Sequence, residues 1–317
     1  MELEFINSKY VFSLYKNLQT VDQPRANIDI NQLLEAVRFG YVQEVVETLR
    51  GTISQDEYKR IKIESLPCVT LSGIFEHRDS KGLVRHSGLM QIDIDIVEDY
   101  EPLFESICRD SFTYVCFKSP GGRGIKAIVK VSPSAETHRD QFKALEVYYQ
   151  NQLGIKIDSQ CIDLSRCMLL SFDPNVYCNP LSDVFEEVFS HSDSTFQKPK
   201  NIAYPAYEKT PDPGAPHQVI ESIIASLERG GIDITESYAD WIKAGFALCE
   251  TFGESGRGYF HRISRMYPDY SFKVVDSKYT ELLSRNNGNT KISSLIYMAQ
   301  QAGVRIPIRN VKRAKWA

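Results

Sequence analysis

The chain has 317 residues, 42% of them hydrophobic and 25% charged, values that are ordinary for a soluble globular protein of about two domains. No apolar run reaches membrane-spanning length, and the acidic start Met1-Glu2-Leu3-Glu4-Phe5 is unlike a signal peptide, so we expect a cytoplasmic protein without membrane contact. The net charge of −4 argues against a surface coated for nucleic acid but leaves room for a local basic groove.

Residues 1–66 are expected to form a helical lead-in that packs on the core. Asp29 and Asn31 are both suited to cap a helix, and Gly51 is suited to end it. Between them the apolar residues have amphipathic spacing: Leu33, Leu34, Val37, Val42, Val45, Val46 and Leu49. A second short helix is expected from Gln55 to Lys62.

Residues 67–190 mix strands and helices with several hairpin-length connections. This pattern predicts an α+β sheet domain and not a regular βαβ series. Strands are expected at 67–75, 90–97, 112–117, 125–131 and 166–172, and helices at 100–109 and 135–152. Gly73, inside the first strand, indicates a bulge or a close backbone approach.

The strand at 90–97 carries two carboxylates. Asp93 and Asp95 alternate with isoleucines, so both project from one face, about 7 Å apart along the strand. Two like charges side by side favour a neutralising cation, and Mg²⁺ or Mn²⁺ takes carboxylate oxygens while leaving positions for phosphates. A strand with one wet face is the alternative interpretation.

A glycine-rich loop, Ser119-Pro120-Gly121-Gly122-Arg123-Gly124, leads into the strand that carries Lys126. Its glycines allow close approach to a ligand, its N–H groups can bind an anion, and Arg123 and Lys126 add positive charge. The loop is neither a Walker motif nor a dinucleotide fingerprint, because a strand follows it. A plain hairpin turn is the alternative interpretation.

A third group of polar residues follows at Asp158, Asp163 and Arg166. Asp158 is suited either to complete a metal site with Asp93 and Asp95 or to start a turn. Arg166 precedes an apolar strand, where it is suited to bind a phosphate or one of these acids. Cys161, Cys167 and Cys178 lack zinc-type spacing and are expected to be small buried hydrophobes.

Residues 191–216 are rich in proline and are expected to form a linker, and residues 217–317 are expected to form a small helical domain with a basic tail. The tail has no acid, and its cations are Arg305, Arg309, Lys312, Arg313 and Lys315. Such a tail is suited to bind phosphates, or it is a solvated end.

Taken in order, the three groups resemble the motifs of the archaeo-eukaryotic primase superfamily: Asp-x-Asp on a strand, a Ser/Gly-rich loop running into a strand, and a hydrophobic residue before Asp. More narrowly, residues 60 to 185 resemble the VirE-type N-terminal domain of primase-helicase proteins from phages and mobile elements. The stretches that carry this resemblance are Leu66-Pro67 with Thr70-Leu71-Ser72-Gly73, Ile92-Asp93-Ile94-Asp95, the loop through Lys126, and Ser165-Arg166 with Ser171-Phe172-Asp173-Pro174.

The resemblance implies a primase-polymerase-like mixed sheet core with RRM-like elements. It also implies that Asp93, Asp95 and Asp158 are catalytic metal ligands, with Asp163 competing for the third place. The residues implied to bind the nucleotide are Ser119, Gly121, Gly122, Arg123, Lys126 and Arg166. The wider superfamily usually has histidine where Lys126 stands, and lysine offers a point charge in place of imidazole hydrogen bonding.

The C-terminal region resembles the primase C-terminal helical domain around Tyr238-Ala239-Asp240-Trp241 and along 292–303. This domain is implied to hold template or initiating nucleotide, or to join the core to a helicase. No helicase-type phosphate loop occurs in the chain, so a helicase would be a missing domain or a separate partner.

The leading hypothesis is a DNA primase-polymerase that uses Mg²⁺ or Mn²⁺, nucleoside triphosphates and a single-stranded DNA template in replication of a phage or mobile element. The second is a catalytically inactive primase-fold module that binds nucleic acid in replication initiation. A third is a metal-dependent nuclease, or a nucleotidyltransferase that acts on another acceptor through the same acids.

Overall fold

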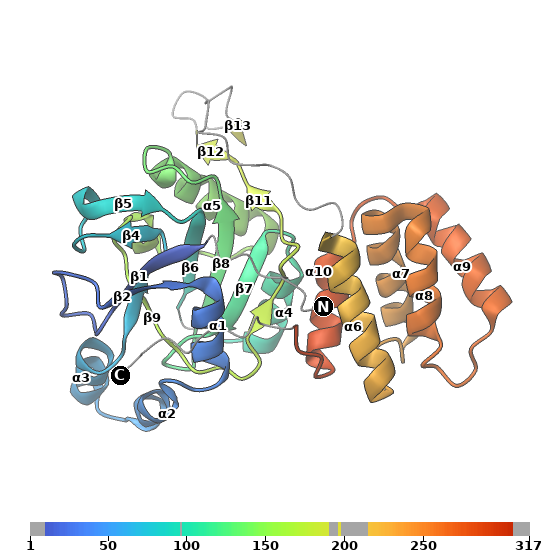
Figure 1. Ribbon diagram of the computed structural model, residues 1–317, viewed down its shortest axis with the longest axis horizontal. Helices are drawn as coiled ribbons and strands as arrows, with labels where there is room; N and C mark the ends of the chain where they lie inside the picture. The colour runs from blue at the N-terminus through green and yellow to red at the C-terminus, as the bar shows by residue number, and fades with distance from the viewer. Residues whose placement is uncertain (1–9, 96, 190–195, 198–214, 307–317) are drawn as a thin grey trace.

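The computed structural model describes residues 10–95, 97–189, 196–197 and 215–306, and Figure 1 shows a region of sheets and helices beside a helical region. The strands are β1 (Val11–Tyr15), β2 (Ala26–Asp29), β3 (Cys68–Thr70), β4 (Gly73–Phe75), β5 (Leu83–His86), β6 (Leu89–Ile94), β7 (Thr113–Lys118), β8 (Ile125–Val131), β9 (Met168–Leu169), β10 (Tyr177–Cys178), β11 (Val184–Phe185), β12 (Val188–Phe189) and β13 (Phe196–Gln197).

The α-helices are α1 (Ile30–Arg38), α2 (Gln43–Gly51), α3 (Gln55–Glu64), α4 (Tyr100–Arg109), α5 (His138–Leu153), α6 (Ala215–Gly230), α7 (Tyr238–Phe252), α8 (Arg257–Ser264), α9 (Phe272–Arg285) and α10 (Ile292–Gln301). Short 3₁₀ helices lie at Ser80–Gly82, Ser159–Ile162 and Gly253–Gly256. The strands lie between Val11 and Gln197, and only helices are described from Ala215 on, which confirms the predicted α+β class with an all-helical C-terminal part.

Two sheets form the framework of the first region. One has the order β2-β1-β3-β9, and the other has the order β10-β7-β8-β11 with β6 paired to β8. Because side chains alternate along a strand, Ile128 of β8 packs in one hydrophobic core with β1 and α1, while Ala127 and Val129 pack in the other with α4 and α5. The second sheet is therefore buried on both faces at β8, the strand with which β6 pairs.

The prediction of a helical lead-in over 1–66 is wrong for residues 11–29. Strands β1 and β2 are antiparallel, with Phe12 opposite Ile28, and β1 also pairs with β3. Because β1 lies between two other strands, four of its five residues are buried and no helical spacing is required. Helices then follow, but the single helix expected up to Gly51 is divided into α1 and α2 around Gly40, whose φ of +77° is left-handed. The expected second helix is α3. Asp29, not Asn31, caps α1 in a capping box with Gln32.

Two predicted strands are interrupted or shortened. The strand expected at 67–75 breaks at a turn between β3 and β4, and a Cβ at Gly73 would lie 2.2 Å from the carbonyl oxygen of Arg85. Gly73 therefore marks a close backbone approach. The strand expected at 166–172 is shorter in the structure, where only β9 pairs with β3. One further backbone hydrogen bond, from Leu170 N to Pro67 O, follows this pairing.

Helix α10 joins the helical region to the sheet region, and Figure 1 shows it between α4 and α7. The side-chain amide of Gln300 donates to Cys178 O at 2.8 Å and accepts from Cys178 N at 3.2 Å, which pairs the backbone of β10 on its outer side. Ser293 Oγ donates to Arg109 O, and the Arg109 guanidinium lies 5.6 Å from the ring centre of Tyr297. The helical region is thus held by specific contacts as well as by the intervening chain.

Part of the predicted linker and most of the predicted tail cannot be compared. Residues 191–195 and 198–214 of the expected linker lie outside the described residues, whereas 196–197 form β13 and 215–216 already belong to α6. Arg309, Lys312, Arg313 and Lys315 also lie outside them. None of the described helices has both the length and the apolar composition needed to cross a membrane.

Candidate active site

The first site residue, Asp93, lies directly opposite Lys126 in the antiparallel pairing of β6 with β8. Opposite residues of neighbouring strands present their side chains on the same face, so the two groups meet. Lys126 Nζ lies 2.5 Å from Asp93 Oδ2, and the two side chains are 8% and 24% exposed. The pair places a cation against the carboxylate where the sequence predicts a metal ion.

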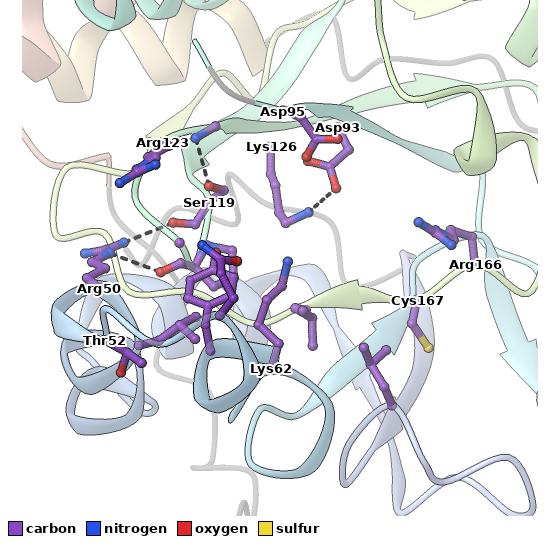
Figure 2. A pocket seen from close by; sticks show the side chains of 18 of the residues that line it. Arg50, Thr52, Lys62, Asp93, Asp95, Ser119, Arg123, Lys126, Arg166 and Cys167 are labelled. Carbon is purple, nitrogen blue, oxygen red and sulfur yellow. Dashed lines mark hydrogen bonds and ion pairs between the residues drawn. The ribbon is translucent and has the colours of Figure 1, made fainter. Parts of the chain in front are cut away.

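Asp95 follows the end of β6 and is exposed. Asp93 and Asp95 line the same cavity, of about 620 Å³, and Figure 2 shows their carboxylates side by side near Lys126. The same-face geometry predicted from the alternation along the strand therefore holds for these two acids.

The glycine loop forms a second wall of this cavity and closes on itself. Ser119 N donates to Gly124 O at 2.8 Å, and Gly124 N donates to Ser119 Oγ at 3.0 Å. The N–H groups of Gly121 and Arg123 donate to no acceptor within the described part of the chain. Two backbone donors thus remain for a ligand beside the carboxylates.

Two of the loop glycines are required by the space around them. A Cβ at Gly124 would lie 2.4 Å from Ile94 O, so only glycine lets the loop pack against the end of β6. Gly122 has a φ of +78°, in the left-handed region. The loop is therefore more than a plain hairpin turn, because its backbone lies against the residues that flank Asp95.

The third motif lies beside the first through the backbone, since Asp158 N donates to Asp93 O at 2.8 Å. The Asp158 side chain accepts from Gln160 N at 3.0 Å and from Arg166 Nη2 at 3.3 Å. Asp163, not Asp158, lines the cavity with Asp93 and Asp95. Among the residues described, no three His, Cys, Asp or Glu side chains are close enough to hold one metal ion.

The cavity is positively charged although the whole chain is acidic. Its lining contains three carboxylates, those of Asp93, Asp95 and Asp163. Its lining contains six cations, those of Arg50, Lys62, Arg78, Arg123, Lys126 and Arg166. An excess of positive charge in a concave site attracts and holds anions.

Four of the six cations have no carboxylate partner among the described residues. Arg50 donates to backbone carbonyls, and Arg78 donates to one carbonyl and to the sulfur of Cys167. Lys62 contacts the ring of Tyr58, 5.5 Å away, and Arg123 is exposed. Figure 2 shows Lys62 pointing from α3 into the cavity. Lys62 and Arg123 are thus available to a negatively charged ligand.

Sequence reasoning missed one wall of this site, which α2 and α3 provide. Arg50 donates to Ser119 O and Pro120 O, both at 3.2 Å, and to Phe172 O at 3.0 Å, and burial lowers its pKa. Tyr58 lies against the loop, because a Cβ at Gly121 would meet its hydroxyl at 2.1 Å. From the sequence, these helices were expected only to pack on the core. Their polar residues were the only sign that they line a site.

The cysteine prediction holds for Cys161 and Cys178, which are buried. Cys167 differs, because it is half-buried, lines the cavity and accepts from Arg78 Nη1 at 3.4 Å. A hydrogen bond from Cys68 and the nearby guanidinium of Arg78 lower the pKa of the Cys167 thiol. Cys167 therefore lines the cavity and also packs against the hydrophobic core.

Two segments match known protein families. Residues 61–178 match the family model described as BT4734-like, N-terminal domain, and residues 225–299 match Primase C terminal 2. The chain has a primase-associated architecture. The second match also indicates a primase-related role in replication. Comparisons with curated proteins and with solved structures found no match.

The first matched segment covers most of the stretch on which the sequence resemblance depends, including Asp93, the glycine loop and Arg166. It begins at residue 61, so Arg50 and Tyr58 lie outside it although they line the same cavity. The narrower assignment to a VirE-type primase-polymerase stays a prediction.

Proposed function

We propose that the chain is a DNA primase-polymerase that adds nucleotides to a strand paired with a single-stranded DNA template. The observation that carries this proposal is the pair Asp93 and Asp95 in a basic cavity with a glycine loop, in a chain with two primase-associated segments. In the proposed reaction a 3′-hydroxyl attacks the α-phosphate of a nucleoside triphosphate, and pyrophosphate leaves.

The triphosphate would be bound mainly by groups that have no hydrogen-bond or carboxylate partner among the described residues. The N–H groups of Gly121 and Arg123 and the side chains of Arg123 and Lys62 face the same cavity. Lys126 would shift its hydrogen bond from Asp93 towards a phosphate oxygen. These residues would orient the α-phosphate towards the attacking hydroxyl and neutralise the leaving pyrophosphate.

The carboxylates of Asp93 and Asp95 fit a divalent ion. They supply hard oxygen ligands, and the ammonium of Lys126 at 2.5 Å from Asp93 Oδ2 indicates that a positive charge is favoured there. Mg²⁺ or Mn²⁺, when bound, would neutralise phosphate charge and activate the attacking hydroxyl. Asp158 would need to leave Arg166 to join them, and Asp163 already lines the cavity.

The pairing of acids with cations favours a second candidate function. Asp93 is bound to Lys126 and Asp158 to Arg166, so two of the three predicted ligands are already neutralised. The same positive cavity would bind nucleic acid phosphates without turnover. A catalytically inactive module that binds nucleic acid in replication initiation is therefore the alternative.

The test is an extension assay with single-stranded DNA, labelled ribo- and deoxyribonucleotides, and Mg²⁺ or Mn²⁺, with and without a primer. Template-dependent products from the wild type and none from Asp93→Ala/Asp95→Ala would support the polymerase, and products without primer would make it a primase. An Asp22→Ala/Asp183→Ala variant, which removes two exposed acids outside the cavity lining, is the matched control.

The outcomes separate the two candidates. DNA binding without product under either metal would contradict polymerase activity and support the inactive module. Product strands that shorten would contradict both and indicate a nuclease.

A further inference from the structure

A second cavity, of about 250 Å³, lies in the helical region between the start of α7 and the segment that joins α8 to α9. Four aromatic side chains line it: Tyr238, Trp241, Tyr267 and Tyr270. We call this cavity the aromatic pocket. The predicted function does not use it, and it lies within the segment that matches Primase C terminal 2.

Exposed apolar groups concentrate at this pocket. Ten large hydrophobic side chains are exposed among the described residues. Three of them line the pocket: Tyr238, Tyr267 and Val274. Tyr238 is 66% exposed and Tyr267 is 45% exposed, while Phe272, at 62%, begins the adjoining α9. A concentration of exposed aromatic surface on a soluble domain marks a binding surface.

The rings at the base of the pocket are held in place. Trp241 Nε1 donates to Ser264 Oγ at 2.8 Å, and its ring stacks on Phe260 with a centroid distance of 5.3 Å and an interplanar angle of 20°. The Tyr270 hydroxyl lies 2.9 Å from Nδ1 of His261. Rings fixed in this way lose little conformational entropy when a flat ligand packs on them.

The charged residues at the pocket are of two kinds. Glu236 and Asp269 are exposed acids that line it, and no Lys or Arg is among the lining residues. Carboxylates repel a phosphate but accept hydrogen bonds from N–H groups of a base. Two cations outside the lining contact its rings. Lys278 Nζ lies 3.3 Å from the Tyr238 hydroxyl and also pairs with Glu281, and the Arg265 guanidinium lies 5.8 Å from the centre of the Tyr270 ring.

We propose that the aromatic pocket binds an unstacked nucleobase, with Tyr238 and Tyr267 contacting the base and Lys278 and Arg265 near the attached phosphates. The base belongs either to a single-stranded nucleic acid or to a free nucleotide. This inference adds a second binding site to the proposed function and rests on it only for the class of ligand. Base-aromatic stacking tolerates any sequence, because every base has a flat face.

The test uses the full chain with Trp316→Phe, which leaves Trp241 as the only tryptophan. Its fluorescence is measured during titration with a single-stranded oligonucleotide, an abasic oligomer of equal length, and a nucleoside triphosphate. We expect the oligonucleotide to quench Trp241 and the abasic oligomer to leave it unchanged. Quenching by the triphosphate alone would identify a free nucleotide as the ligand.

Tyr238→Ala and Tyr267→Ala are expected to weaken oligonucleotide binding about tenfold or more each. Tyr41→Ala, which removes a tyrosine that is 40% exposed and lies outside the pocket, is the control and is expected to have no effect. Because both pocket tyrosines are largely exposed, the variants should keep the wild-type melting temperature, which is measured in parallel.

Three results would overturn the inference: equal binding of the abasic oligomer, unchanged binding in both tyrosine variants, or no change in Trp241 fluorescence with any of the three titrants. The extension assay is separate from these measurements. A chain that binds bases through Tyr238 but does not extend a strand would contradict the polymerase alone, and an active chain with unaffected tyrosine variants would contradict the aromatic pocket alone.

Discussion

Lys126 Nζ and Asp93 Oδ2 lie 2.5 Å apart because their strands set them opposite each other, and the lysine is the more buried partner, with 8% of its side chain exposed against 24% for the aspartate. Removing one partner of a buried ion pair lowers the free energy of unfolding most when the remaining charge cannot reach water. The two single substitutions at this pair are therefore not equivalent.

Asp93→Ala should lower the free energy of unfolding by about 3 kcal/mol, because it leaves the buried ammonium of Lys126 unpaired. Lys126→Met should lower the free energy of unfolding by less, since the Asp93 carboxylate that remains is more accessible to solvent. Urea denaturation of both variants and of the double variant measures the difference and the coupling between the residues. Equal losses in the two single variants would contradict the asymmetry.

Arg50→Lys should destabilise the glycine loop although it preserves the charge. The guanidinium of Arg50 donates to three carbonyl groups, and an ammonium cannot reproduce this planar arrangement. We expect a loss of about 1–3 kcal/mol in urea denaturation and weaker nucleotide binding. Arg60→Lys, at a residue whose side chain is 61% exposed, should change stability by less than about 0.5 kcal/mol.

Gly124→Ala should abolish nucleotide binding or unfold the loop, because the new Cβ would lie 2.4 Å from the fixed carbonyl oxygen of Ile94. Gly258→Ala, in α8, meets no atom within 4 Å and should stabilise the chain by about 0.4–1 kcal/mol. Calorimetric titration with a nucleoside triphosphate and thermal melting separate the two effects. Normal binding by Gly124→Ala would show that the loop adjusts freely.

Lys62→Gln should weaken binding of a nucleoside triphosphate about tenfold, because Lys62 points into the cavity without a carboxylate partner in the described chain. Lys59→Gln removes an exposed lysine of the same helix that does not line the cavity, and it should leave affinity unchanged. The affinities are measured at two salt concentrations, since an ionic contact weakens as salt rises. Equal affinities would exclude α3 from the substrate site.

The pair formed by the half-buried His86 and the buried His138 should make stability depend on pH. Their rings are 3.1 Å apart at His86 Nε2 and His138 Nδ1, and burial lowers the pKa of His86 to about 3 and that of His138 to about 4. Because an unfolded histidine titrates near 6.5, the unfolded state binds more protons than the folded state between pH 6.5 and 4.

Stability should therefore fall as pH decreases through that range, by about 1.4 kcal/mol per pH unit for each ring. Urea denaturation at several pH values measures the slope, which the double variant His86→Asn/His138→Asn should reduce. His77→Asn, at a histidine whose side chain is 50% exposed, should leave the slope unchanged. An unchanged slope in the double variant would assign the pH dependence to carboxylates.

The local parts of the site were predictable from sequence, and the long-range parts were not. Alternation along one strand predicted that Asp93 and Asp95 share a face, and glycine spacing indicated a loop with free N–H groups. The register that opposes Asp93 to Lys126 connects residues 33 positions apart, and Arg50 reaches Phe172 across 122 positions. No periodicity in either segment encodes such a pairing.

The strands of residues 11–29 were missed for a related reason. Val11–Tyr15 is too short to establish a period, and its burial depends on β2 and β3 on either side. The wall formed by α2 and α3 was likewise visible as helix but not as site, because Tyr58 meets the glycine loop only in the folded chain.

The contact between Gln300 and Cys178 also affects how the chain is made. The outer N–H and C=O of Cys178 are bonded by a side chain that lies 122 positions later, so they stay without these partners until that residue leaves the ribosome. An unpaired strand edge can join another chain. During synthesis the first region therefore has an unpaired strand edge until Gln300 has been made and can cover it.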